Sequence, residues 1–160
     1  MGTILVGDDD PDDRLLVEEA LGNCTPCYAL RFAEDGVELM DYLRHKGAFA
    51  DVARSPLPGL ILLDLNMPRM SGREALRAIK SDAQLRSIPV IIWTTSHAEE
   101  DIEASYRDGA DRFVTKPTTF VELQHVLCAL AHTWLSDPAS VCALDAGVED
   151  FGTFAHPRTE

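Results

Sequence analysis

The sequence predicts one α/β domain, a doubly wound five-stranded parallel sheet with five helices, over roughly residues 3–135. Continuously apolar runs such as Leu60–Leu63 and Val90–Trp93 are typical of strands that are buried on both faces of a parallel sheet. Five apolar runs alternate with amphipathic stretches, which is the βα order of such a domain. A chain of 160 residues is long enough to bury one such core.

Each predicted strand is followed by a signal for the start of a helix. The apolar runs are Ile4–Gly7, Cys27–Ala33, Leu60–Leu65, Ile88–Thr94 and Arg112–Thr115. The cap signals are Asp10, Asp35 and the capping boxes Ser71–Glu74, Ser96–Glu99 and Thr119–Glu122. Helix ends are expected near Gly22, Gly47 and Gly109. Residues 45–59 form a long connection, and residues 136–160 form a C-terminal extension that is either mobile or dimer-related.

The charge balance narrows the classes of partner. Asp and Glu outnumber Lys and Arg by 27 to 14, for a net charge of −13. A field of this sign repels nucleic-acid phosphates and anionic lipids, so we expect neither nucleic acid nor membrane as a partner, and it favours a cation. The chain has no 18-residue apolar run and no basic-then-apolar leader, so we expect a cytoplasmic protein.

Four cysteines are present, at Cys24, Cys27, Cys128 and Cys142. Cys24 and Cys27 have the spacing of a redox or zinc-binding pair. However, they follow a predicted helix, whereas a reactive thiol pair precedes one, and a zinc site needs about four ligands. We therefore expect reduced cysteines that serve as ordinary structural residues.

Polar residues stand where the predicted strands end. Asp8–Asp10 follow the first strand, Asp64 follows the third, Thr94 ends the fourth and Lys116 follows the fifth. The carboxyl ends of parallel strands meet at one edge of the sheet, so these side chains are expected to share one crater. Crowded carboxylates favour a bound cation, and Mg²⁺ takes carboxylates together with phosphate oxygens. An Asp nucleophile with a lysine for phosphate oxygens predicts a Mg²⁺-dependent phosphoryl site.

Four sequence blocks resemble the signature motifs of response-regulator receiver domains in order, spacing and position at strand ends: Ile4–Pro11, Leu63–Gly72, Trp93–Ser96 and Thr115–Pro117. The resemblance implies a flavodoxin-like receiver fold that accepts a phosphoryl group on Asp64 from a sensor histidine kinase.

The same resemblance implies a role for each further site residue. Asp8, Asp9, Asp64 and the backbone carbonyl of Asn66 would bind Mg²⁺. Thr94 and Lys116 would hold the phosphoryl group, and Thr94 and Phe113 would form the conformational switch. Gly7 departs from the family pattern, in which an apolar residue ends the first strand, so that end is either looser or shaped by an unusual neighbour.

Within the family, the chain is most similar to the small phytochrome response regulators of cyanobacteria and other bacteria. The similarity rests on the segment before the third strand, on Leu63–Arg69, on Thr94–Ser96 and on Trp134. It implies a phytochrome as the kinase and a downstream protein target reached by contact, without an output domain. It also implies a homodimer through the surface of the fourth helix, the fifth strand and the fifth helix.

Two other functions stay open at this point. An Asp-nucleophile phosphatase would carry a second Asp as general acid two residues after Asp64, where this chain has Asn66, so we expect no enzyme beyond self-phosphorylation from small donors and slow autodephosphorylation. An unphosphorylated interaction scaffold is the second. Purely structural roles are also open: Asp8–Asp13 would then only favour the start of a helix, and Phe113 would be only a core aromatic.

Overall fold

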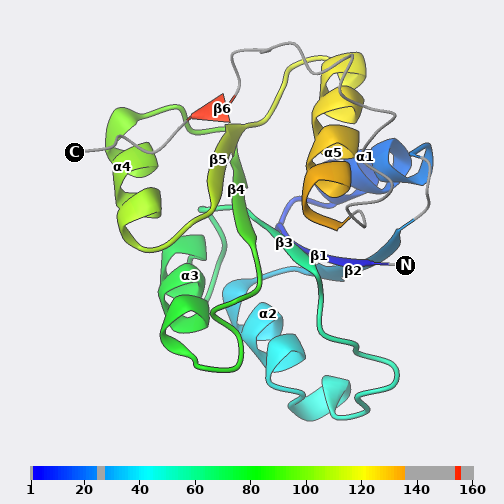
Figure 1. Cartoon of the computed structure of the whole chain (residues 1–160), viewed down its shortest axis with the longest axis vertical. Helices are drawn as coiled ribbons and strands as arrows, with labels where there is room; N and C mark the ends of the chain where they lie inside the picture. Colours follow the sequence, from blue (N-terminus) through cyan, green and yellow to red (C-terminus); the bar gives the residue numbers. More distant parts are fainter. Residues whose placement is uncertain (1, 25–27, 136–153, 156–160) are drawn as a thin grey trace.

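The computed structural model describes residues 2–24, 28–135 and 154–155. Its sheet has five parallel strands in the spatial order β2-β1-β3-β4-β5, with helices on both faces (Figure 1). The strands are β1 (Thr3–Gly7), β2 (Ala29–Ala33), β3 (Leu60–Leu63), β4 (Val90–Thr94) and β5 (Arg112–Thr115). The predicted doubly wound α/β fold is confirmed.

A short sixth strand extends this sheet. β6 (Phe154–Ala155) pairs antiparallel with β5, with Phe113 opposite Ala155 and Val114 opposite Phe154 (Figure 1). It belongs to the predicted C-terminal extension, whose other residues lie outside the described part of the chain. Two residues carry no alternating pattern, so the sequence offered no signal for this strand.

The helices divide between the two faces of the sheet. α1 and α5 cover one face, and α2, α3 and α4 cover the other (Figure 1). Their bounds are α1 (Pro11–Gly22), α2 (Gly36–Leu43), α3 (Gly72–Ser81), α4 (Glu99–Arg107) and α5 (Phe120–Leu135), with a 3₁₀ turn η1 (Gly47–Phe49) in the long connection. None of the helices in the described ranges combines the length and the apolar character that a membrane span needs.

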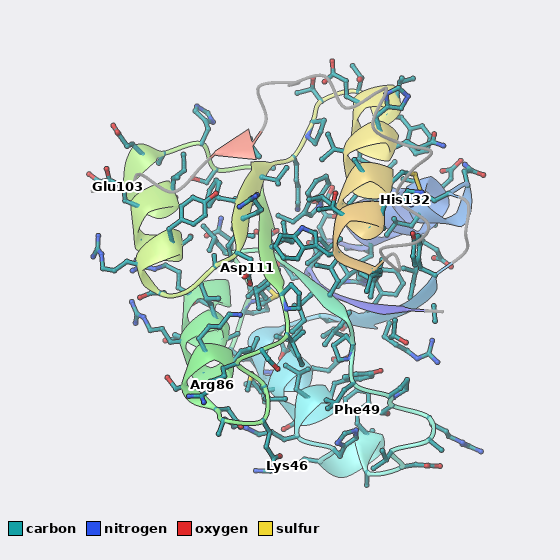
Figure 2. The ribbon with its side chains drawn as sticks, in the orientation of Figure 1. Lys46, Phe49, Arg86, Glu103, Asp111 and His132 are labelled. Atoms are coloured by element: carbon teal, nitrogen blue, oxygen red, sulfur yellow. A yellow bond between two sulfur atoms is a disulfide. The ribbon has the colours of Figure 1, made fainter. Side chains whose placement is uncertain are left out.

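Alternate strand residues build two separate cores. Leu60 and Leu62 face the core under α1 and α5, whereas Ile61 and Leu63 face the core under α2 and α3. All four are at most 1% exposed, which explains why β3 is apolar at every position. Figure 2 shows the side chains that fill the space between the sheet and each helix layer. In the core under α2 and α3, Phe49 packs on Tyr42, with ring centroids 5.2 Å apart.

Most of the predicted caps are present. Asp10 accepts a hydrogen bond from the Asp12 N–H, and Asp35 accepts one from the Glu38 N–H. Both halves of the Ser71–Glu74 capping box are formed. Thr119 accepts from the Glu122 N–H at 3.3 Å. These caps fix where α1, α2, α3 and α5 begin relative to the strand ends.

Two predicted boundaries are wrong. The Ser96–Glu99 capping box does not form, because α4 begins only at Glu99 and the Ser96 hydroxyl instead donates to Asp101 at 2.5 Å. Gly47 does not end α2, which stops at Leu43. The chain turns instead at His45, whose φ of 53° is stabilised by a 2.7 Å contact between its ring Nε2 and the Ser55 carbonyl oxygen.

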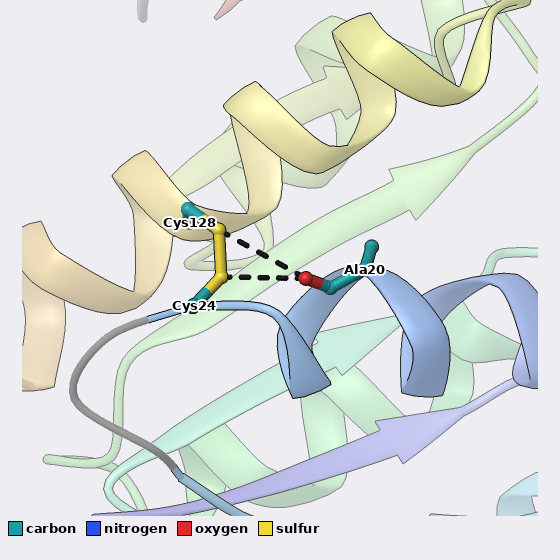
Figure 3. The surroundings of a disulfide bond; sticks show 3 residues. All are labelled: Ala20, Cys24 and Cys128. Carbon is teal, nitrogen blue, oxygen red and sulfur yellow. Dashed lines mark hydrogen bonds between the residues drawn. A yellow bond between two sulfur atoms is a disulfide. The ribbon is translucent and has the colours of Figure 1, made fainter.

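The expectation of reduced cysteines is also wrong for two of the four. Cys24, just after α1, is joined by a disulfide to Cys128 in α5 (Figure 3). The packing of α1 against α5 brings together two residues that are 104 positions apart, which spacing along the sequence cannot reveal. Cys27 and Cys142 lie outside the described residues, so the Cys24–Cys27 pair remains untested.

Candidate functional site

The predicted site residues gather at the carboxyl edge of the sheet, because the sheet hydrogen bonds continue one residue past the strands. The Asp8 N–H donates to the Ala33 carbonyl at 3.0 Å, and the Asp64 N–H donates to the Gly7 carbonyl at 2.9 Å. The Lys116 N–H donates to the Thr94 carbonyl at 2.7 Å. Each side chain is therefore held in place by the backbone of a neighbouring strand.

Lys116 lies at the centre of the site. Its Nζ is 2.8 Å from Asp8 Oδ2, 2.8 Å from Asp13 Oδ2 and 3.0 Å from Asp64 Oδ2. The Lys116 side chain is only 7% exposed and that of Asp8 is 0% exposed, so these are charge-assisted hydrogen bonds in a poorly solvated place. One ammonium group thus links the ends of β1, β3 and β5.

Asp13 is a site residue that the sequence reasoning missed. Its place in the first turn of α1 has a sufficient local explanation, because acids favour helix N-termini. The structure shows that the Pro11 helix start directs Asp13 towards Lys116. The available signal was its position in the first turn of a helix that leaves the predicted crater.

Three carboxylates could hold a metal ion. Asp8, Asp9 and Asp64 each offer an oxygen that lies within 4.8 Å of the other two, and Asp9 is exposed. Hard carboxylate oxygens at a partly open position suit a divalent cation such as Mg²⁺ that retains waters. Asn66 is adjacent, since its backbone N–H donates to Asp64 Oδ1 at 3.2 Å. The donor set therefore fits the expected ion.

Burial and charge act in opposite directions at this site. Burial raises the pKa of the Asp8 carboxyl above its ordinary value, although the hydrogen bond from Lys116 partly offsets this effect. Burial alone would lower the pKa of the Lys116 ammonium, but hydrogen bonds to Asp13 and Asp8 and the charge of Asp64 outweigh it and raise that pKa. Lys116 is consequently a permanent cation.

The two expected switch residues are both buried. Thr94 is 0% exposed and its Oγ1 accepts from the Ser96 N–H at 3.4 Å. Phe113 lies wholly within the core on the α2, α3 and α4 side, and its backbone N–H donates to the Tyr106 hydroxyl at 3.1 Å. Thr94 reaches the site edge, while Phe113 is a core aromatic in this conformation.

The loop that follows β3 is held closely by its surroundings. The Gly72 N–H donates to the Leu65 carbonyl at 2.9 Å, and a Cβ on Gly72 would overlap the Asp64 carbonyl oxygen. Arg69, at φ 62°, forms two hydrogen bonds to Asp35 at 2.9 and 3.0 Å. The loop carrying Asn66 is therefore tied both to α3 and to the start of α2.

Gly7 ends β1 without loosening it. It is paired with Ala33 on one side and Leu63 on the other. A Cβ there would lie 3.0 Å from Leu39 Cδ1 and 3.2 Å from Leu63 Cδ1. The unusual-neighbour interpretation holds, because the Leu39 side chain fills the space that a larger residue would take.

Comparison with known proteins agrees with this geometry. The sequence model of the response regulator receiver domain matches residues 4–128. The chain belongs to this family. It is a receiver-domain response regulator, and the matched residues include the four sequence blocks named above.

Individual relatives indicate which members of the family this chain is similar to. Response regulator Rcp1 of Synechocystis sp. is 38% identical over 132 residues, which is 82% of this chain and 88% of Rcp1. The phosphorylated cyanobacterial phytochrome response regulator RcpA superposes with a TM-score of 0.78 at 38% identity, covering 84% of this chain and 94% of RcpA. The Mn²⁺-bound form of Rcp1 gives a TM-score of 0.76 at 37% identity, covering 85% and 96%. The chain is thus homologous to phytochrome response regulators.

Proposed function

We propose that this response regulator accepts a phosphoryl group on Asp64 from a sensor histidine kinase and passes the signal to a downstream protein by contact. The observation that carries the proposal is the contact of Lys116 with Asp64 and Asp8 at the shared strand edge. An Asp carboxylate can attack phosphorus to form an acyl phosphate, provided that the charge on the phosphoryl oxygens is neutralised.

The chain's own residues divide this work. The Asn66 N–H hydrogen-bonds Asp64 Oδ1 and Lys116 hydrogen-bonds Oδ2, so the nucleophile is held in one orientation. On phosphorylation, Lys116 moves its charge to a phosphoryl oxygen, and Thr94 turns its hydroxyl towards another. Asp8 and Asp13 remain to hold the lysine in reach.

We propose Mg²⁺ as the cofactor, held by Asp8, Asp9, Asp64 and the backbone carbonyl of Asn66. The ion supplies further positive charge against the phosphoryl oxygens. The clustering of three carboxylate oxygens within 4.8 Å supports this assignment, as does the Mn²⁺-bound form of the homologous Rcp1.

Thr94 and Phe113 are the proposed switch. The repositioning of Thr94 towards the phosphoryl group vacates space at the end of β4, next to β5. A population in which Phe113 is buried, as here, is then favoured over any in which it leaves the core. The result is a changed surface over α4, β5 and α5, which alters the affinity for a downstream target.

The partners follow from homology and charge. The likeness to RcpA and Rcp1 supports a phytochrome as the kinase. The net charge of −13 argues against nucleic acid and membrane as partners. We propose the cytoplasm as the location of the protein. We propose no enzymatic activity beyond self-phosphorylation from small donors and slow autodephosphorylation, since Asn66 stands where a phosphatase would need its general acid.

We also propose a homodimer through the α4, β5 and α5 surface. Arg112 of β5 lies 5.9 Å from the Trp134 ring centroid of α5, so this surface combines an aromatic with a cation. β6 pairs with β5 here, and a partner must therefore either pack over β6 or displace it. Light scattering with and without beryllofluoride tests the proposal, and a monomer at high concentration in both conditions would refute it.

The experiment for the proposed function is the intact mass after incubation with acetyl phosphate and Mg²⁺. Wild type is expected to gain one phosphoryl group, and Asp64→Asn none. The control is Asp12→Asn, which removes an exposed acid in the first turn of α1 and is expected to gain the phosphoryl group as wild type does. EDTA should abolish the gain, and Asp9→Ala should weaken Mg²⁺ binding. A chain that binds neither the phosphoryl group nor beryllofluoride would instead be the unphosphorylated scaffold.

A further inference from the structure

The disulfide between Cys24 and Cys128 lies on the α1–α5 contact, away from the phosphoryl chemistry (Figure 3). The two Cα atoms are 5.7 Å apart, which is within the range that a disulfide requires. Cys24 is 4% exposed, whereas Cys128 is partly exposed on α5. The helix packing therefore holds the two sulfurs together, and Cys128 is the less buried of the two residues.

The surroundings suit the thiol form as well as the disulfide. The sulfurs of Cys24 and Cys128 lie 3.4 Å and 4.0 Å from the carbonyl oxygen of Ala20 (Figure 3). The Cys24 backbone N–H donates to the Leu21 carbonyl, and the Ala20 carbonyl accepts from the Asn23 backbone N–H at a long 3.4 Å. A carbonyl oxygen has two lone pairs, so a reduced thiol can donate to Ala20 as well. Neither state leaves a buried sulfur without a suitable neighbour.

We propose that Cys24 and Cys128 form a reversible thiol–disulfide site that exchanges with low-molecular-weight disulfides. In a reducing cytoplasm a close cysteine pair is more often redox-responsive than permanently oxidised. The Cys128 thiolate attacks the small disulfide, forms a mixed disulfide and releases one small thiolate. Cys24 then attacks the Cys128 sulfur and expels the second. Two protein thiols are oxidised by two electrons, and one small disulfide is reduced to two thiols.

The cross-link restrains the two helices that leave the phosphoryl site. α1 begins directly after Asp8–Asp10 and carries Asp13, and α5 begins four residues after Lys116. A bond that closes a separation of 104 residues removes much of the entropy of the unfolded chain. Oxidation therefore stabilises the domain behind the site, an input that goes beyond the proposed phosphoryl switch and does not depend on it.

The test begins with the full chain, reduced and then incubated with oxidised glutathione. Before alkylation, the intact mass should be lower by two hydrogens than that of the reduced protein. After alkylation, the oxidised chain should carry two fewer alkyl groups than the reduced chain, and peptide mapping should show Cys24 linked to Cys128. Excess reduced glutathione should reverse the link. The double variant Cys27→Ser/Cys142→Ser should behave in the same way, since it keeps the proposed pair.

Thermal unfolding of wild type and of one cysteine variant gives the second readout. Oxidised wild type should melt about 5–15 °C above reduced wild type, and Cys128→Ser should show no difference between the two conditions. The proposal is overturned by a link that joins other cysteines, by glutathione adducts without the Cys24–Cys128 link, or by a link that reduced glutathione does not open. Equal melting temperatures of the oxidised and reduced chains would also overturn it.

Discussion

Replacing Lys116 with methionine tests whether its ammonium group holds the acidic site together. The variant keeps an unbranched side chain but leaves Asp8, Asp13 and Asp64 without the cation that they contact at 2.8–3.0 Å. At an effective dielectric of about 20, a unit charge pair at such a distance attracts by roughly 5–6 kcal/mol before desolvation. Removing one partner of a buried pair costs about 3–5 kcal/mol.

We expect Lys116→Met to lower the free energy of unfolding by about 3 kcal/mol, near the low end of this range. The reason is that Asp8 can take up a proton and so relieve the repulsion among the three carboxylates. Burial already raises the pKa of Asp8 above 3.8, and losing the lysine raises it further. The folded state then binds more protons than the unfolded state between pH 3.8 and that raised pKa, so stability falls as the pH rises through this window. The loss should therefore be smaller in mild acid than at neutral pH.

Thermal unfolding in EDTA and in Mg²⁺ is the assay. In EDTA at neutral pH, Lys116→Met should melt roughly 10 °C below wild type. Mg²⁺ should raise the melting temperature of the variant more than that of wild type, because the ion replaces the missing positive charge. The control is Lys80→Met, since Lys80 bonds Asp111 and the Ile88 carbonyl away from the site. A variant that melts like wild type, or a Mg²⁺ effect equal to that in the control, would refute the reasoning.

Further substitutions test the loop after β3 and its tie to α2. Burial would raise the pKa of Asp35, but hydrogen bonds from Arg69 and the helix start outweigh it and lower that pKa. Its charge therefore stabilises the fold above pH 3.8, an effect lost as the pH falls through the lowered value. Asp35→Asn should thus lose stability in urea titrations at neutral pH and match wild type in strong acid, and a constant difference would contradict this. Gly72→Ala should destabilise by about 3 kcal/mol or more because its Cβ meets Asp64 backbone, whereas Gly7→Ala meets only side chains and should cost about 1 kcal/mol; equal losses in urea unfolding would contradict the difference.

Local patterns predicted most of the fold. Runs such as Leu60–Leu63 are apolar at every position because both sheet faces are buried, and that property is visible along the chain. Caps such as Asp35 and Ser71 act within three residues of themselves, so they too were predictable. Ser96 failed as a cap because its hydroxyl bonds Asp101, a competing local choice that the sequence pattern does not rank.

The sequence by itself determined the fold and the clustering of Asp8, Asp64 and Lys116, because parallel strands bring their carboxyl ends to one edge whatever the details of packing. Only the tertiary structure decided which atoms Lys116 contacts and that Asp13 is among them, since that depends on how α1 lies against the end of β5. It alone joined Cys24 to Cys128 and placed β6 beside β5. Those contacts link distant segments through helix packing and sheet pairing, and neither leaves a periodic trace in the sequence.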